Sequence, residues 1–172
     1  TQQGTNDDDI LYGHSDNDAI DGGLGNDTIW AKDGDDVLTG GSGNDELVGG
    51  AGDDKLFGGN DNDHLHGNEG NDFLDGGEGD RDDYLEGTNG ADILEGGKGN
   101  DIYHFSGDFG RDIIYNKDIV NLQPNEQHDR IEFSDFLLKD IILQRNNDNL
   151  YLISKKQQSN TVIIYHHFEN NG

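Results

Sequence analysis

The chain lacks several features that define common protein classes. It has no cysteine among its 172 residues, which excludes a disulfide framework and a cysteine-ligated zinc site. It has no run of 18 apolar residues, so we expect no membrane-spanning helix. Basic residues are scarce, with 11 Lys and Arg against 37 Asp and Glu, and a net charge of −26 would repel phosphates. We therefore expect no nucleic-acid partner.

Hydrophobic residues are also scarce, at 30% of the chain against about 45–50% in ordinary globular domains. Low hydrophobicity with high net charge is typical of disordered segments. Composition alone leaves two alternatives, an acidic disordered linker and a fold that depends on bound cations. The order of the residues has to separate them.

The composition changes near residue 116. Residues 1–115 carry a net charge of −24 and 26 of the 27 glycines, whereas residues 116–172 carry a net charge of −2. The sequence begins with the polar residues Thr1 to Gly4 and shows no signal-peptide pattern, so we interpret it as a piece of a larger protein. We expect two parts, a glycine-rich anionic part over 1–115 and a β-rich segment over 116–172.

The anionic part is an internal repeat. An aspartate recurs every nine residues, with two spacings of eleven, and a hydrophobic residue follows two positions later. The aspartates are Asp9, Asp18, Asp27, Asp36, Asp45, Asp54, Asp63, Asp72, Asp83, Asp92, Asp101 and Asp112. The first eleven hydrophobic partners are Leu11, Ile20, Ile29, Leu38, Leu47, Leu56, Leu65, Leu74, Leu85, Leu94 and Tyr103. A random linker would not keep this register, so the repeat favours a fold.

Each position of the nonapeptide has a physical role. Gly at positions one, two and four allows φ > 0 and close packing of a tight loop, and Asp7, Asp16 and Asp61 replace it at position four as residues that tolerate the left-handed region. Position five is mostly Asn or Asp, as turns prefer, and position six is the aspartate. Positions seven to nine predict a three-residue strand with position eight pointing inward.

The units Gly40–Val48 and Gly49–Phe57 match the pattern G-G-x-G-x-D-x-U-x, and the chain thereby resembles RTX (repeats-in-toxin) calcium-binding proteins, which Gram-negative bacteria export by type I secretion. The resemblance implies an all-β fold, a right-handed parallel β-roll with two repeats per turn and a C-terminal β-strand cap. It also implies Ca²⁺ held between each loop and the loop two repeats later, with the twelve aspartates as ligands and roughly eight to ten ions in all. One edge would carry Asp9, Asp27, Asp45, Asp63, Asp83 and Asp101, and the other Asp18, Asp36, Asp54, Asp72, Asp92 and Asp112.

Electrostatics predict that this roll needs its cations. Carboxylates stacked about 5 Å apart repel by about 3 kcal/mol per pair at an effective dielectric constant near 20. One buried aliphatic side chain per repeat, at roughly 1.5–3 kcal/mol, does not offset that repulsion together with the ordering entropy of the glycines. We therefore expect residues 1–115 to be unfolded without calcium and folded with it.

Four apolar-rich segments follow and predict strands: 130–133, 137–143, 150–153 and 161–168, with turns at 146–149 and 155–160. This part is similar to the segment after the last RTX block of pore-forming haemolysins and leukotoxins, in the stretches 100–103, 129–131 and 148–150 and in His167-Phe168. We expect residues 116–172 to cover the end of the roll, because a solenoid exposes its last apolar turn.

Some units depart from the pattern and are expected to bind calcium more weakly. Thr5, His14, Lys32 and Asn68 stand at position two, and a two-residue insertion at 78–83 is expected to distort the site near Asp83. Two surface features also stand out. We interpret His64 and His66 as a solvated pair rather than as a transition-metal site. Four aromatic side chains are expected to point outward: Trp30, Phe57, Phe73 and Tyr84. We interpret them as single surface residues rather than as a contact patch.

The sequence therefore predicts a calcium-binding, non-enzymatic module of a secreted, extracellular protein, with calcium and the type I secretion machinery as partners. No catalytic residues are predicted, because the repeat accounts for the aspartates. The haemolysin-like flank favours a toxin as the parent. Two alternatives remain open: an adhesin or ligand-binding module that contacts host cells or glycans, and an accessory C-terminal domain of a secreted protease, lipase or epimerase.

Overall fold

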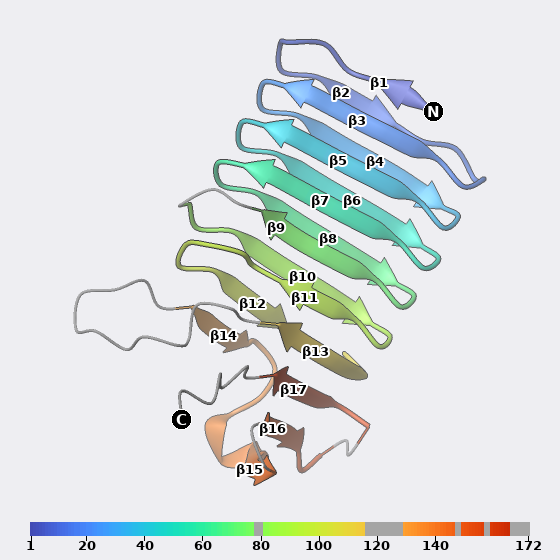
Figure 1. The fold of residues 1–172 in the computed structure, drawn as a ribbon. Coiled ribbons are helices and arrows are strands. Elements are labelled where there is room, and N and C mark those ends of the chain that lie inside the picture. The colour runs from blue at the N-terminus through green and yellow to red at the C-terminus, as the bar shows by residue number, and fades with distance from the viewer. Residues whose placement is uncertain (78–80, 116–128, 147–148, 157–158, 166–172) are drawn as a thin grey trace, which may run out of the picture.

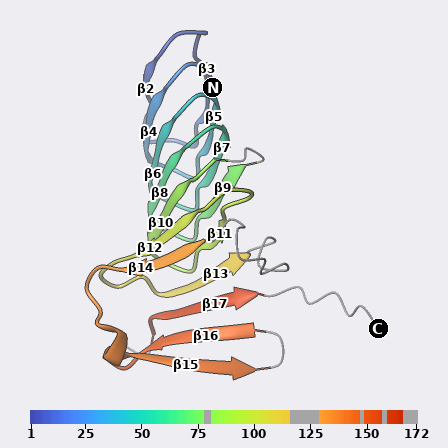
Figure 2. The ribbon, with the colours of Figure 1, turned by 90° about the vertical axis from the view of Figure 1, so that its left-hand side faces the viewer.

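Two β-sheets, built from alternate repeats, face each other along the length of the molecule (Figures 1 and 2). The computed structural model describes residues 1–77, 81–115, 129–146, 149–156 and 159–165. Each repeat contributes one strand, and the chain passes from one sheet to the other at every loop. Strands in the same sheet are parallel and come from repeats two apart, as in the pairing of Leu47 with Leu65. The predicted two repeats per turn and the parallel β-solenoid are confirmed.

The larger sheet has ten strands and the smaller has seven. In order across the larger sheet, the strands are β1 (Gln2–Gln3), β3 (Ala19–Leu24), β5 (Val37–Ser42), β7 (Lys55–Asn60), β9 (Phe73–Gly77), β11 (Ile93–Glu95), β13 (Arg111–Tyr115), β17 (Thr161–Tyr165), β16 (Asn149–Ser154) and β15 (Ile141–Asn146). In order across the smaller sheet, they are β14 (Arg130–Phe133), β12 (Ile102–Phe105), β10 (Tyr84–Asn89), β8 (His64–Glu69), β6 (Glu46–Ala51), β4 (Thr28–Asp33) and β2 (Ile10–Tyr12).

The core is a single column of side chains between the sheets. All eleven hydrophobic residues predicted at position eight are buried, with exposed fractions from 0% to 7%. Their neighbours at positions seven and nine lie on the outer faces, so the predicted alternation is confirmed. Each repeat thus buries one large apolar side chain, and the column stays thin.

Most strands are longer than predicted. The prediction gave three residues, at positions seven to nine, but β6 runs for six residues, from Glu46 to Ala51. The pairing between β6 and β8 is interrupted at Gly49. It continues at Gly50 and Ala51, which pair with Asn68 and Glu69. Gly50 has φ +128°, a conformation in which the chain bends yet stays in the ladder.

Among the residues that the structure describes, four other than glycine have a positive φ. Lys32, Asn68 and Thr88 stand at position two, and Asp61 stands at position four. The prediction that aspartate replaces glycine in a left-handed conformation at position four is therefore confirmed at Asp61. It is wrong for Asp7 and Asp16, whose φ angles are not positive.

The C-terminal segment continues both sheets before it ends them. β14 pairs in parallel with β12, and β17 pairs in parallel with β13. β16 and β15 then add antiparallel strands, with Asn146 opposite Asn149, as the predicted strand pair requires. Residues 138–140, predicted as part of a strand, form the 3-10 helix η2 (Leu138–Asp140) instead. The insertion at 78–80, Asp148 of the predicted turn and the pair His167-Phe168 lie outside the described residues.

The division at residues 115 and 116 stays a prediction, although β14 and β17 extend the stacks of β12 and β13. Phe105 and Phe109 lie at the end of the core column, with ring centroids 5.2 Å apart, and Phe133 and Phe136 pack against them. Within the described residues, no helix is long and apolar enough to cross a bilayer.

Truncation of one core side chain tests the thin column. Leu56 is fully buried in β7, while its neighbour Lys55 is exposed on the outer face. We expect Leu56→Ala to lower the free energy of unfolding of the calcium-loaded chain by about 2–5 kcal/mol, and Lys55→Ala to change it by less than about 0.5 kcal/mol. Thermal and urea unfolding in excess calcium measure both, and equal effects of the two variants would contradict the assigned core.

Candidate metal centre

The aspartates at position six lie in the loops, immediately before the strands. Those from Asp27 to Asp112 are buried, with exposed fractions of 0% to 4%. Each carboxylate accepts a hydrogen bond at Oδ1 from the backbone N–H of the aspartate one turn earlier. On the edge that leads into the smaller sheet, Asp45 N–H donates to Asp63 Oδ1 at 2.8 Å; on the other edge, Asp54 N–H donates to Asp72 Oδ1 at 2.9 Å. The two predicted sets of six aspartates therefore do form two separate stacks.

The second carboxylate oxygen has a different environment. In eight of these aspartates Oδ2 is buried and makes no hydrogen bond to any described residue. They are Asp27, Asp36, Asp45, Asp54, Asp63, Asp72, Asp92 and Asp112. Leaving a buried charged oxygen without a partner is costly, so this array of oxygens requires either protons or cations.

The glycine at position one leaves space beside that oxygen. A Cβ added to Gly58 would lie 2.5 Å from Asp63 Oδ2 and 2.7 Å from the carbonyl oxygen of Gly76, one turn later. Gly22, Gly40 and Gly76 show the same arrangement with their own aspartate and the next turn's carbonyl. Gly58 does not have a positive φ, so the predicted left-handed conformation is wrong for this residue, whereas the predicted close packing is present. A side chain at position one would fill the space between the two oxygen atoms, and the Asp36 unit, with Ala31 at this position, is an exception to the glycine pattern.

These residues fit a hard cation. Ca²⁺ is bound by oxygen ligands at 2.3–2.6 Å, from carboxylates and backbone carbonyls together. In the part of the chain that the structure describes, no three His, Cys, Asp or Glu side chains cluster as a metal site, so backbone oxygens would have to complete the ligand set. The position-six carboxylate of one loop and the position-one carbonyl of the next turn would hold the ion, which would supply the missing positive charge.

Burial controls the proton affinity of these carboxyl groups. It raises the pKa of Asp45 to about 6, of Asp54 to about 7 and of Asp63 to about 8. Neighbouring carboxylates add to the increase, while the hydrogen bond from the backbone N–H opposes it. For Asp112 burial raises the pKa to about 9. At pH 7 Asp63 and Asp112 thus favour the neutral form when no cation is bound, whereas Asp45 favours the charged form.

The first turn differs from the others. Asp9 Oδ2 accepts hydrogen bonds from Thr5 N–H at 2.6 Å and from Thr5 Oγ1 at 2.8 Å. Asp18 Oδ2 accepts one from His14 N–H at 2.7 Å, and this bond is the main reason why the pKa of Asp18 is lowered. Both carboxylates therefore already have partners, at two of the four units whose position-two residue predicts weaker binding.

The predicted distortion at the insertion does not reach the carboxylate stack. Asp63 N–H donates to Asp83 Oδ1 at 2.8 Å across the insertion, the same distance as in the regular turn from Asp45 to Asp63. Gly76 also keeps its place beside Asp83 Oδ2 and the Gly96 carbonyl. The register of the stack is therefore independent of the extra residues.

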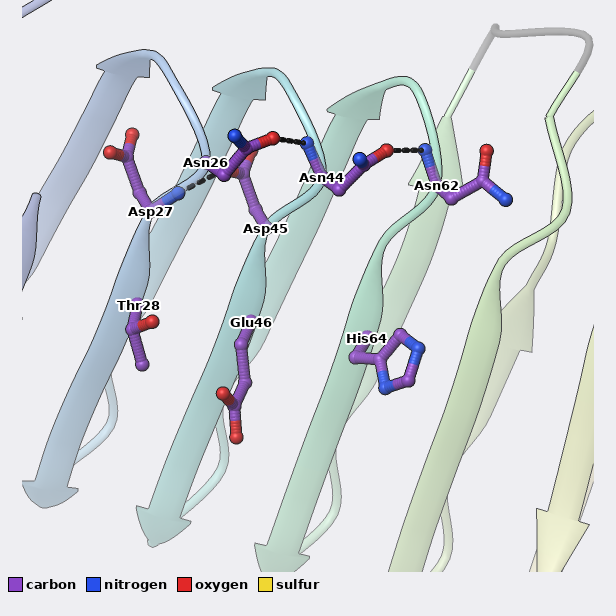
Figure 3. Close-up of a pocket in the computed structure, with 8 residues that line it drawn as sticks. All are labelled: Asn26, Asp27, Thr28, Asn44, Asp45, Glu46, Asn62 and His64. Atoms are coloured by element: carbon purple, nitrogen blue, oxygen red, sulfur yellow. Dashed lines mark hydrogen bonds between the residues drawn. The ribbon is translucent and has the colours of Figure 1, made fainter. Parts of the chain in front are cut away.

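A second stack at position five was not predicted. Asn44 N–H donates to Asn26 Oδ1 at 2.8 Å and Asn62 N–H donates to Asn44 Oδ1 at 3.0 Å, in the direction opposite to the aspartate stack (Figure 3). Together with Thr28, Glu46 and His64, these side chains line a shallow hollow on the loop edge. Position five was predicted only to be a turn residue. The sequence did indicate the stack, because Asn and Asp recur at this position and their short side chains hydrogen-bond to the backbone.

Asp129 was also missed as a member of the aspartate stack. Its Oδ1 accepts a hydrogen bond from Asp101 N–H at 2.9 Å, so the stack extends one turn into the C-terminal segment. The sequence indication was present, because Asp129 is followed by an aliphatic residue two positions later, as in the repeats.

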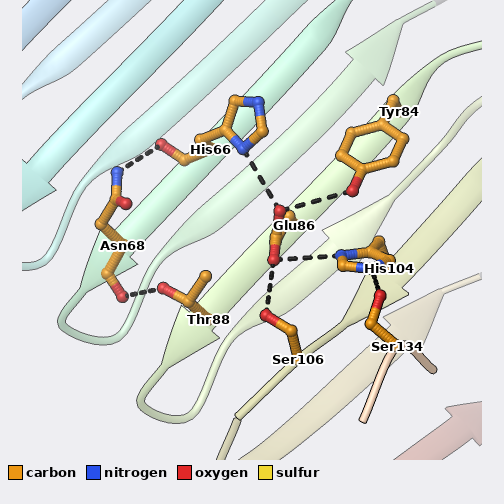
Figure 4. Close-up of polar contacts among 8 residues, drawn as sticks. All are labelled: His66, Asn68, Tyr84, Glu86, Thr88, His104, Ser106 and Ser134. Atoms are coloured by element: carbon orange, nitrogen blue, oxygen red, sulfur yellow. Dashed lines mark hydrogen bonds and ion pairs between the residues drawn. The ribbon is translucent and has the colours of Figure 1, made fainter. Parts of the chain in front are cut away.

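A polar cluster on the outer face of the smaller sheet joins the roll to the C-terminal segment (Figure 4). Glu86 lies 3.5 Å from His66 Nδ1 and 3.0 Å from His104 Nδ1, and it accepts a hydrogen bond from Ser106. These contacts, led by that of His66, lower the pKa of Glu86 to about 2. His104 also contacts Ser134, which follows β14. His66 is therefore an ion-pair partner rather than one half of a solvated pair with His64.

Filling the space at one position-one glycine tests the site geometry. We expect Gly58→Ala to remove one calcium ion from the total bound, because its Cβ would occupy the space between Asp63 Oδ2 and the Gly76 carbonyl. The matched control is Asn60→Ala, an exposed position at the end of the same strand. Isothermal titration calorimetry gives the stoichiometry, and an unchanged ion count in Gly58→Ala would refute the assigned ligands.

The raised pKa values also predict a dependence on pH. These aspartates bind protons more tightly in the cation-free roll than in the unfolded chain, where the pKa is near 3.8. Their contribution to the stability of the cation-free roll is thus fully present below pH 4 and is lost as the pH rises through about 6 to 8. Where the chain is folded without cations, calcium must displace these protons, so its apparent affinity should fall as the pH falls from 8 to 5. Calorimetry in buffers of different ionisation enthalpy measures the released protons, and a folded cation-free chain that binds calcium at pH 6 without releasing protons would contradict the raised values.

Comparison with known proteins agrees with this geometry. The sequence matches the RTX calcium-binding nonapeptide repeat family over residues 3–29, 21–56, 30–65, 48–81 and 79–114. No curated protein matches the sequence. Among solved structures, the extracellular lipase LipA from Serratia marcescens is 22% identical, with 91% of this chain and 37% of the lipase covered and a TM-score of 0.42. The AlgE6R3 subunit of the Azotobacter vinelandii mannuronan C5-epimerase is 22% identical, with 94% of this chain and 72% of that subunit covered and a TM-score of 0.26.

The chain thus spans 37% of the length of the lipase. Neither of these two structures is of a haemolysin. The family match extends from residue 3 to residue 114, which is more than half of the chain. This protein therefore belongs to the RTX calcium-binding nonapeptide repeat family, as a calcium-binding β-roll.

Proposed function

We propose that this chain is a calcium-triggered folding module of an exported protein. The observation that carries the proposal is the array of eight buried Oδ2 atoms without hydrogen-bond partners among the described residues, six of them beside a position-one glycine. Calcium would neutralise these oxygens and link each loop to the next turn. The proposed ligands are the twelve predicted aspartates, and the proposed count stays at roughly eight to ten ions.

Folding and metal binding would then be one process. Without a cation, the roll would have to bury a carboxylate in nearly every loop, at a cost that one aliphatic side chain per repeat does not offset. In the low calcium of a cytosol the chain would remain unfolded and able to pass through an export channel. In millimolar external calcium it would fold, which is the affinity range of extracellular modules. We therefore propose an extracellular location and export by type I secretion.

The module itself is proposed to have no enzymatic activity, because its aspartates serve the two stacks. The parent protein is a separate question. A toxin of the haemolysin type remains one hypothesis, based on the flanking segment alone. An accessory domain of an exported lipase, protease or epimerase is the second, and an adhesin is the third. The full sequence of the parent protein would distinguish them.

A calcium titration tests the proposed switch. We expect far-UV circular dichroism to show an unfolded chain in chelator and a cooperative change to β-structure as calcium rises to about 10 mM. Magnesium at the same concentration should leave the chain unfolded, because Mg²⁺ requires a smaller octahedral site and holds its water strongly. A chain that is already folded in chelator at pH 7.5 would refute the switch.

The double variant Asp45→Ala/Asp63→Ala probes the ligands within this titration. It removes two successive carboxylates of one stack, so we expect fewer bound ions and a higher calcium midpoint. Asp33→Ala/Asp75→Ala, which removes the same charge outside the two stacks, is the matched control. If both variants move the midpoint equally, net charge rather than ligation explains the effect.

A further inference from the structure

The two sheets end in four edge strands, and one of them differs from the rest. The larger sheet has β1 and β15 as its edge strands, and the smaller sheet has β2 and β14. An exposed edge presents unpaired backbone N–H and C=O groups that can pair with another strand. Proteins usually protect such edges by keeping them short or by placing charges on them.

Three of these edges carry such protection. β1 has two residues, and β2 has three residues that directly follow the run Asp7 to Asp9. β14 has four residues, and its Arg130 and Glu132 alternate with apolar side chains. Length and charge therefore disfavour pairing at each of these three strands.

β15 lacks both forms of protection. It has six residues, begins with Ile141, Ile142 and Leu143, and contains one charged residue, Arg145. It pairs with β16 on one side, and no described strand lies on its other side. Ile142 is 42% exposed and Leu143 is 61% exposed, and they lie on opposite faces of the sheet. Both faces thus offer apolar contacts to an added strand.

The charge distribution indicates which strand would pair there. Residues 1–115 carry a net charge of −24 and residues 116–172 carry −2, so two copies repel each other least through their C-terminal segments. β15 lies at the end of the molecule opposite to the N-terminus, and contact there would direct the two rolls away from each other (Figures 1 and 2).

Strand direction favours the same partner. A twofold axis perpendicular to a strand makes its two copies antiparallel, and β17, β16 and β15 already form an antiparallel series. A second β15 would therefore continue the existing pattern. With the axis normal to the sheet, residues on the same face lie opposite each other, and Leu143 can pack against the partner's copy of itself.

We propose that β15 is a self-association edge, through which two folded copies of this chain pair antiparallel about a twofold axis and join their larger sheets. The contact consists of one strand and a few apolar side chains, so the dimer is weak and concentration-dependent. The inference concerns the folded chain and does not depend on which residues bind calcium.

Sedimentation velocity in excess calcium tests this dimer over about 5–500 µM, a range that covers weak association. The wild-type chain is expected to shift from monomer to dimer. Leu143→Lys should weaken the dimer by about tenfold or more, because a charged edge side chain opposes pairing. Val37→Lys is the matched control, since Val37 is 40% exposed on β5, in the interior of the same sheet.

Cysteine cross-linking gives a second readout that needs no loss of function. The chain contains no cysteine, so Leu143→Cys introduces a single thiol at the proposed axis. Mild oxidation should yield a covalent dimer of Leu143→Cys and little from Val37→Cys, with circular dichroism confirming that both are folded. A wild-type chain that stays monomeric throughout, or equal cross-linking of both variants, overturns the proposal.

Discussion

The buried carboxylate at position six is the constraint on which the rest of this structure depends. One of its oxygens accepts a backbone N–H from the previous turn, as Asp63 does from Asp45, and this bond fixes the spacing between successive loops. The other oxygen lies near a carbonyl of the following turn, and a Cβ added to Gly58 would be 2.5 Å from Asp63 Oδ2 and 2.7 Å from the Gly76 carbonyl oxygen. A roll that repeats this arrangement needs a cation or a proton at nearly every loop.

The same constraint explains the composition of the repeat. Glycine at position one keeps the space open, glycine at position two bends the strand, and only position eight is left for the core. The core is therefore too thin to stabilise the fold alone, and stability has to come from contacts between successive turns, as in other solenoids. Low hydrophobicity and high net charge, which are typical of disorder, are here the consequence of a site that recurs once per repeat.

Much of this was predictable from the sequence. The nine-residue period indicated one strand per repeat with a single inward side chain, and the resemblance to RTX proteins implied parallel strands, two repeats per turn and two stacks of aspartates. The full strand length, the position-five stack and the role of Gly58 were not predictable in the same way. They depend on the distance between successive turns in the folded chain, which the spacing of residues in the sequence does not give. Asp129 was missed because it follows Asp101 by 28 residues, a separation that departs from the nine-residue period.

The roll ends where the chain replaces carboxylate with hydrocarbon. Asp112 lies beside the buried Val162, at the register position where the earlier turns place another aspartate. No carboxylate is available there to accept the next N–H, so the stack on that edge stops. Apolar packing around Phe109 and Phe133 takes over, and the sheet turns to antiparallel pairing. The change from charge to hydrocarbon thus ends the part of the fold that contains the aspartate stacks, and it also leaves β15 as an apolar, nearly uncharged edge.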